Sequence, residues 1–323
     1  MKKNIFLFLF FILGYLSNAQ NDFEINCIVT NYPKRFSSPS ILAEKIKKDF
    51  ETENAKARAI YSWIAFNIRY DVKKSQNPPK RKVIKFKNEI ERQEKEKRLL
   101  DKQVNKTISS RKGICGDYAL LYYRLATLVG LKCEINIGTA KTINYDIGKK
   151  RATVNHAWNS VEINGEWKLL DSTWGAGYVD EETDKFEPNY NLFYFATPED
   201  LFFSKHFPKD GVWHNVVLDK KKFLEAPLFY SDYLNDSFEI LEPKLGVLEV
   251  KKQSVIFFKI KNLNSESKIQ YSLRRVEEFG TVEKINKIDD LITFEIKIDK
   301  TIGKFLTLYI DGSGVATYKI IQK

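Results

Sequence analysis

The spacing of apolar residues predicts helices in the first half of the chain. In residues 39–50 and 52–69, apolar side chains recur every three or four positions, as on the buried face of an amphipathic helix. Residues 115–129 are apolar almost all round, which indicates a helix buried on most sides. Gly130 follows this segment, at the position where a left-handed residue commonly ends a helix.

Alternating apolar and polar residues then predict strands over 132–137, 153–163 and 166–172. The last two are joined by Asn164-Gly165, a two-residue sequence typical of a tight hairpin. A symmetric loop at this turn would pair Ile163 with Glu166. The paired strands and the helix that begins at Cys115 predict an α+β core.

The pattern changes after about residue 240. Short alternating segments recur about every 8–12 residues and are separated by polar turns, which is typical of a small β-sandwich. We therefore expect one domain over 20–235, in which a buried helix carrying Cys115 packs against an antiparallel sheet. A C-terminal immunoglobulin-like β-sandwich is expected over 240–323.

The net charge of +11 is concentrated in one segment. Residues 73–112 contain 15 Lys and Arg against 5 Asp and Glu, and without this block and Lys2 and Lys3 the chain sums to −1. Such blocks are usually solvated helices or tails, so we expect a charged insertion at about 78–112 that contributes little to the core. An acidic partner or a membrane surface is the alternative. Nucleic-acid binding is disfavoured because Phe86 is the segment's only aromatic residue.

The first residues have the order of a secretory signal peptide. Lys2 and Lys3 precede an apolar run over 5–16, and small residues follow at Ser17 and Ala19. The run is shorter than the roughly 20 residues that cross a membrane. We expect residues 1–19 to be removed and the mature protein to be periplasmic or secreted, with no stable membrane anchor. The alternative is an uncleaved N-terminal anchor.

Cys115 is the leading candidate for chemistry. It follows a glycine-containing turn and begins the predicted buried helix, where unpaired N–H groups and the helix dipole favour a thiolate. In the hairpin, the symmetric register puts His156 and Asp171 on one face as diagonal neighbours, about 7–8 Å apart at the backbone. The order Cys, His, Asp is that of a nucleophile, a base and a group that orients the base. The alternatives are a buried thiol and a structural His–Asp pair.

Four separated motifs, in the same order, resemble the transglutaminase-like (papain-like) superfamily, in its branch containing kyphoscoliosis peptidase and the fungal cytokinesis proteins. The resemblance covers roughly residues 40–215. It implies that Cys115 is the nucleophile, His156 the general base and Asp171 the orienting residue. The second oxyanion donor stays open, because Gln103 lies in the charged segment. The matching stretches are 61–71, 113–119, 156–159 and 170–177.

Other residues near these motifs are candidates for substrate contact. Trp158 and Trp174 flank the motifs and could form the walls of the site, with core packing as the alternative. Asp117 lies in the first helical turn, where a carboxylate suits the dipole and could also touch substrate. Cys133 is expected to be a buried thiol, with a disulfide to Cys27 as the alternative. No metal or cofactor is expected.

The sequence therefore predicts an exported thiol enzyme that acts on amide bonds of a protein or peptide, which could belong to the cell envelope. A thioester resolved by water would make it a peptidase or deamidase, and one resolved by an amine a transamidase. The rival hypothesis is a catalytically weak or inactive fold that binds a peptide or an envelope partner.

Overall fold

The computed structural model describes residues 23–78, 85–180, 182–230, 233, 238–251, 254–273, 279–282, 284–298 and 303–323. The predicted signal peptide lies outside these ranges. The chain forms two compact units that alternate along the sequence, one from residues 1–136 and 157–197 and the other from 137–156 and 198–323. Its secondary structure is α+β, as predicted. No helix among the described residues is both long and apolar enough to cross a membrane.

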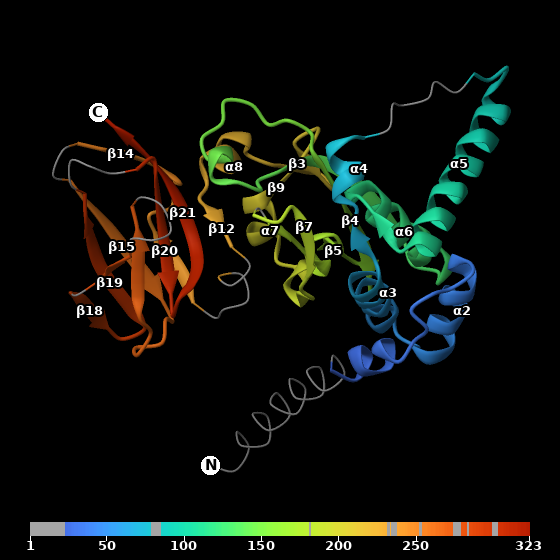
Figure 1. Ribbon diagram of the computed structural model, residues 1–323, viewed down its shortest axis with the longest axis horizontal. Helices are drawn as coiled ribbons and strands as arrows, with labels where there is room; N and C mark the ends of the chain where they lie inside the picture. Colours follow the sequence, from blue (N-terminus) through green and yellow to red (C-terminus); the bar gives the residue numbers. More distant parts are fainter. Residues whose placement is uncertain are drawn as a thin grey trace, which may run out of the picture. The chain divides into compact units, whose positions relative to one another are not determined.

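The predicted helices of the first unit are confirmed (Figure 1). Helix α2 (Pro39–Asp49) begins after Ser38, whose side chain accepts a hydrogen bond from the N–H of Ile41. Helix α3 (Glu53–Asn67) is capped in the same way by Thr52. These caps satisfy N–H groups that the first helical turn leaves unpaired.

Helix α6 (Cys115–Leu128) packs against α3, and two hydrogen bonds join it to α3 and to the residue that ends α3. The hydroxyl of Tyr118 donates to the carbonyl of Ile68 at 2.7 Å, and that of Tyr122 donates to the carbonyl of Ala57 at 3.2 Å. Gly130 has φ +92°, which confirms its predicted role at the end of the helix. The helix that carries Cys115 is therefore fixed within the core.

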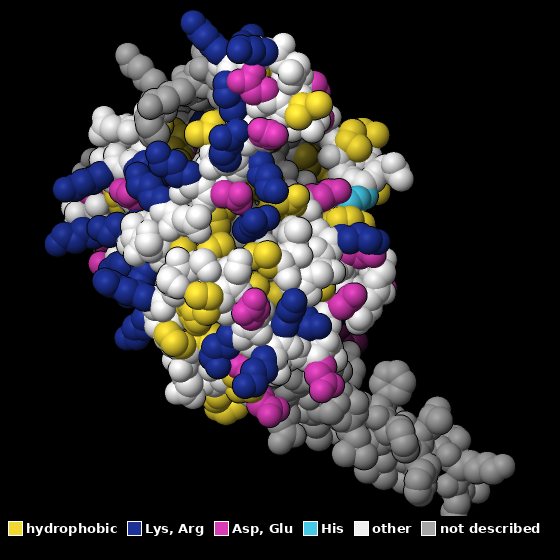
Figure 2. Space-filling model, turned by 90° about the vertical axis from the view of Figure 1, so that its right-hand side faces the viewer, with side chains coloured by type: hydrophobic (Ala, Val, Ile, Leu, Met, Phe, Trp, Pro, Cys, Tyr) yellow, Lys and Arg dark blue, Asp and Glu magenta, His cyan; other side chains and the backbone are white. Residues whose placement is uncertain are grey.

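The charged segment forms α5 (Glu89–Ser110), and its two halves differ. Ion pairs between side chains one helical turn apart stabilise the exposed first half. On the face of the molecule shown in Figure 2, basic and acidic side chains are interspersed. In the second half, Val104 and Ile108 are buried. The expectation that this segment contributes little to the core is wrong for that half, because it packs against α6.

The predicted hairpin is confirmed in type and register. Strands β4 (His156–Ile163) and β5 (Glu166–Leu170) are antiparallel, with Ile163 opposite Glu166 and Asn159 opposite Leu170. Both turn residues, Asn164 and Gly165, have positive φ, as a tight hairpin turn requires. In the first unit β8 pairs with the other edge of β5. The unit's remaining elements are β1 (Arg69–Tyr70), α4 (Val72–Gln76), β2 (Lys112–Gly113), the beginning of β3 (Cys133–Ala140), η2 (Trp174–Ala176), β6 (Gly177–Asp180), β7 (Lys185–Pro188), η3 (Leu192–Tyr194) and β8 (Phe195–Thr197).

The second unit contains two larger sheets (Figure 1). One has the strand order β13-β15-β19-β18, and the other has the order β12-β21-β20-β16-β17, with β14 parallel to β21. The ring of Phe258 stacks on Phe294 within the first sheet and contacts Tyr318 of the second sheet edge-on at 5.5 Å. The C-terminal strands were predicted correctly, and their immunoglobulin-like arrangement stays a prediction.

The second unit also holds the end of β3, which pairs with β9. Its elements are η1 (Asn144–Asp146), α7 (Glu199–Lys205), β9 (His206–Pro208), β10 (Val212–Trp213), β11 (Val216–Val217), α8 (Lys220–Glu225), β12 (Leu228–Phe229), β13 (Glu239–Glu242), β14 (Val247–Val250), β15 (Val255–Lys261), β16 (Ile269–Ser272), β17 (Gly280–Thr281), β18 (Ile285–Ile288), β19 (Leu291–Lys297), β20 (Phe305–Ile310) and β21 (Ser313–Gln322).

Candidate functional site

Cys115 is the first residue of α6 and is half-buried. The N–H groups of Asp117 and Tyr118 both donate to the carbonyl of Ile114, and the N–H of Ile114 donates to the Asp117 carboxylate. The described hydrogen bonds at this end of the helix do not use the N–H groups of Cys115 and Gly116, which can therefore donate to another group. An anion next to the thiol would therefore meet peptide N–H groups.

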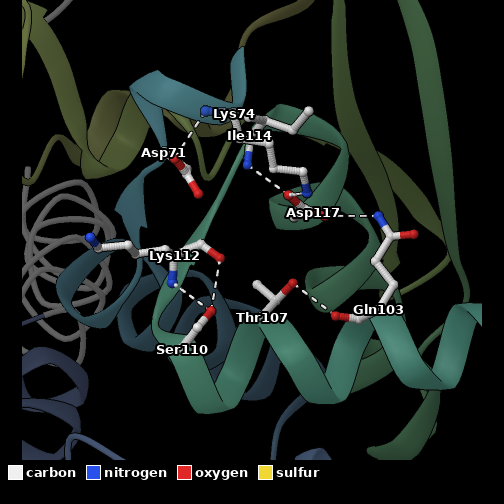
Figure 3. Close-up of polar contacts among 8 residues, drawn as sticks. All are labelled: Asp71, Lys74, Gln103, Thr107, Ser110, Lys112, Ile114 and Asp117. Carbon is white, nitrogen blue, oxygen red and sulfur yellow. Dashed lines mark hydrogen bonds and ion pairs between the residues drawn. The ribbon is translucent and has the colours of Figure 1, made fainter. Parts of the chain in front are cut away.

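Asp117 is the buried centre of a polar network at this helix end (Figure 3). The residue is 1% exposed. Its Oδ2 accepts from the N–H of Ile114 at 2.8 Å and from the ammonium group of Lys74 at 2.5 Å, and its Oδ1 accepts from the side-chain amide of Gln103 at 2.8 Å. Because Lys74 lies on α4 and Gln103 on α5, one carboxylate joins three segments. The network positions the turn that carries Cys115.

Tyr70 lies beside the same turn. It pairs with Gly113 in the parallel contact between β1 and β2. Burial raises the pKa of the Tyr70 phenol. The Cys115 thiol, and after it the Asp171 and Asp117 carboxyls, raise this pKa further, whereas a hydrogen bond to Ser75 lowers it. The thiol and both carboxyls therefore lie within electrostatic range of one hydroxyl group.

Asp171 is buried just beyond the end of β5. The predicted strand over 166–172 is wrong at its end, because Oδ1 of Asp171 accepts hydrogen bonds from the N–H groups of Thr173 at 2.9 Å and Trp174 at 3.1 Å. A side chain that binds the following N–H groups bends the backbone into a turn instead of continuing a ladder. The β4–β5 ladder ends at Asn159 and Leu170, so Asp171 lies beyond its last pair, and its predicted proximity to His156 stays a prediction.

His156 is the first residue of β4 and is assigned to the second unit. Its neighbour Asn155 accepts from the N–H of Ala140 at 2.7 Å and donates to the carbonyl of Ala140 at 3.0 Å, which fixes the backbone at this point. The His156 ring lies 5.5 Å from the ring of His206, centre to centre. His206 itself is buried and stacks on Phe202.

The three residues predicted to contact substrate differ in exposure. Trp158 and Asp117 are each 1% exposed, whereas Trp174 is half-buried and contacts Tyr194 edge-on at 5.6 Å. Substrate contact stays a prediction for all three. The exposure of Trp174 allows direct contact, and the burial of Trp158 and Asp117 favours packing and positioning.

All three cysteines are free. Cys27 is exposed, because residues 23–30 are helical and bury Ile25 and Val29. The alternative of a disulfide between Cys27 and Cys133 is therefore wrong. Cys133 is half-buried, not fully buried as expected, and burial raises the pKa of its thiol.

Sequence reasoning missed two residues of this site. Tyr70 lies in the matching stretch 61–71 but had no predicted role, and Lys74 was counted only within the charged segment. The signal for Lys74 is the buried carboxylate that the first turn of α6 introduces, because such a group needs a donor or a cation. Tyr70 follows from pairing two short segments about 40 residues apart, which no local pattern reveals.

Comparison with known proteins gives one family match and several similar proteins. Residues 38–180 match a family described as a transglutaminase-like domain. Kyphoscoliosis peptidase of Mus musculus is 32% identical over 210 residues, which cover 64% of this chain and 29% of that protein. Cytokinesis protein 3 of Saccharomyces cerevisiae is 26% identical over 138 residues, which cover 39% of this chain and 15% of that protein. This chain thus spans less than a third of the length of either relative.

Among solved structures, a crystal structure described as that of a TGase is 17% identical. The match covers 49% of this chain and 36% of that one, with a TM-score of 0.30. A score this low does not establish a shared overall fold.

Proposed function

Because this chain contains a transglutaminase-like domain distantly homologous to kyphoscoliosis peptidase and yeast cytokinesis protein 3, we propose that it is a thiol enzyme acting on amide bonds. The observation that carries the proposal is Cys115, a half-buried thiol at the first turn of a buried helix. Cys115 and Asp171 both act electrostatically on the phenol of Tyr70. His156, the proposed base, also falls within the matched residues 38–180.

In the proposed reaction, the thiol of Cys115 gives its proton to His156 and the sulfur attacks the carbonyl carbon of a carboxamide or peptide bond. The imidazolium then protonates the leaving amine, and Asp171 orients the ring. The resulting thioester is cleaved by water in a peptidase or deamidase and by an amine in a transamidase. The proposed substrates are proteins or peptides outside the cytoplasm, in agreement with the predicted signal peptide.

Thiol reactivity tests the triad. The experiment uses Cys27→Ser protein, because Cys27 is exposed and would otherwise react. Iodoacetamide at pH 6 should modify Cys115, although an ordinary thiol is under about 1% ionised at that pH. His156→Ala should move the pH profile of alkylation upward, and Asp171→Asn should move it less while still impairing turnover. Cys133, with its raised pKa, is the internal control.

Two outcomes would contradict the proposal. One is an unmodified Cys115 at pH 6, and the other is an alkylation profile that His156→Ala leaves unchanged. Either would favour the rival hypothesis of a binding fold without catalysis. The acyl acceptor can be identified with a glutamine peptide and monodansylcadaverine, because a transamidase incorporates the fluorescent amine and a deamidase releases ammonia only.

A further inference from the structure

We infer that the hydroxyl group of Tyr70 donates a hydrogen bond to the oxyanion that forms when Cys115 attacks a carbonyl group. This inference rests on the proposed function and assigns one further catalytic residue to it. Acyl transfer through a tetrahedral intermediate needs preorganised donors aimed at the developing oxyanion. The end of α6 provides peptide N–H groups, and a side-chain donor would complete the arrangement.

The backbone directs the side chain of Tyr70 toward the first turn of α6. Tyr70 is paired with Gly113, and directly paired residues of neighbouring strands project to the same face. A Cβ atom on Gly113 would lie 2.6 Å from the Cβ of Asp117, so that face is covered by the first turn of α6. The N–H of Asp71 donates to the carbonyl of Gly113 at 2.9 Å and fixes this pairing.

Two other side-chain donors at this helix end already bind Asp117. The amide of Gln103 donates to Oδ1 of Asp117, and the ammonium group of Lys74 donates to Oδ2. The phenol of Tyr70 has the side chain of Ser75 as a hydrogen-bond partner and is not bound to Asp117, and the Cys115 thiol is among the groups that raise its pKa. A phenol with a raised pKa keeps its proton at neutral pH and remains a donor.

The chemical step balances without any further reactant. The sulfur lone pair of Cys115 forms a bond to the carbonyl carbon, and the π electrons of the C=O bond move to its oxygen. The O–H of Tyr70 donates to that oxygen without transferring its proton. When the intermediate collapses, the C=O bond forms again and the bond to the leaving group breaks.

Two probes that react with the same thiol separate this role from others. Acylation by p-nitrophenyl acetate passes through a tetrahedral oxyanion, whereas alkylation by iodoacetamide does not. In the Cys27→Ser protein, Tyr70→Phe should slow acylation of Cys115 by about 100-fold, the typical effect of removing one oxyanion donor. The rate and pH profile of alkylation should stay unchanged. Tyr123→Phe, on the exposed side of α6, is the matched control and should change neither rate.

The outcomes distinguish this inference from the proposed function. Equal loss of both reactions in Tyr70→Phe would show that Tyr70 acts on the thiol or on folding, and it would overturn the oxyanion role. No loss of acylation would also overturn it. If Cys115 of the parent protein is not alkylated at pH 6, the proposed function fails, and the inference fails with it. Because phenylalanine keeps the ring of Tyr70, the variant should retain the fold, which its alkylation profile reports directly.

Discussion

The buried carboxylate of Asp117 offers a quantitative test of how the end of α6 is held. Asp117→Ala removes the acceptor of three donors at once. The N–H of Ile114 would be left unsatisfied, and a donor that is shielded from water in this way costs about 1–3 kcal/mol. Gln103 and Lys74 contribute less, because Gln103 is an exposed residue, the Lys74 side chain is 29% exposed, and both can turn to water. The expected loss in the free energy of unfolding is about 2 kcal/mol.

Asp101 on α5 provides a matched control. Asp101 pairs with Arg124 of α6 at 3.2 Å, but the two side chains are 37% and 34% exposed. Exposed pairs contribute about 0–1 kcal/mol, so Asp101→Ala should lower stability by less than about 1 kcal/mol. Both substitutions remove one aspartate that joins α6 to α5, and they differ mainly in burial.

Urea unfolding followed by tryptophan fluorescence can measure both variants. Trp63, Trp158 and Trp174 all lie in the first unit, so the signal reports largely on the unit that contains Asp117. The midpoint should fall in Asp117→Ala at an unchanged denaturant dependence. If the two variants lose the same free energy, the network is solvated, and Asp117 does not position the Cys115 turn.

Three further predictions follow from individual residues. Burial lowers the pKa of Lys141 to about 7, whereas an unfolded lysine titrates near about 10.4. The unfolded chain therefore binds more protons between these values, and stability should rise from pH 7 to pH 9. Lys141→Met should flatten this rise in urea unfolding, and an equal rise would contradict the prediction. Gly113→Ala should slow alkylation of Cys115 and lower the melting temperature, because its Cβ would clash with Asp117, while Gly116→Ala has open space and should not. N-terminal sequencing of protein from the native host should begin near Gln20, and retention of Met1 would exclude cleavage.

Local patterns of the sequence predicted the main elements correctly. Helices α2, α3 and α6 follow from apolar spacing and from caps that lie within four residues of the helix. The hairpin register follows from Asn164-Gly165, because a two-residue turn leaves one way to pair the flanking strands. These features depend on interactions between residues that are close in the chain, so the sequence alone carries them.

Some local expectations were wrong where a side chain competes with the backbone or a distant segment intervenes. The second half of α5 is polar enough to be read as solvated, yet Val104 and Ile108 are buried against other helices. Asp171 belongs to an apolar run that predicts a strand, but its carboxylate binds two following N–H groups and ends that strand. Hydrophobic periodicity carries no information on either contact.

The sequence by itself identified Cys115, His156 and Asp171 as the candidate chemistry, because their residue types, order and flanking motifs lie along the chain. Only the tertiary structure showed that Tyr70 lies beside the Cys115 turn and that Lys74 and Gln103 hold Asp117. These partners come from segments separated by 14 to 43 residues. Contacts over such separations depend on how elements pack in three dimensions, and no periodicity along the chain encodes that packing.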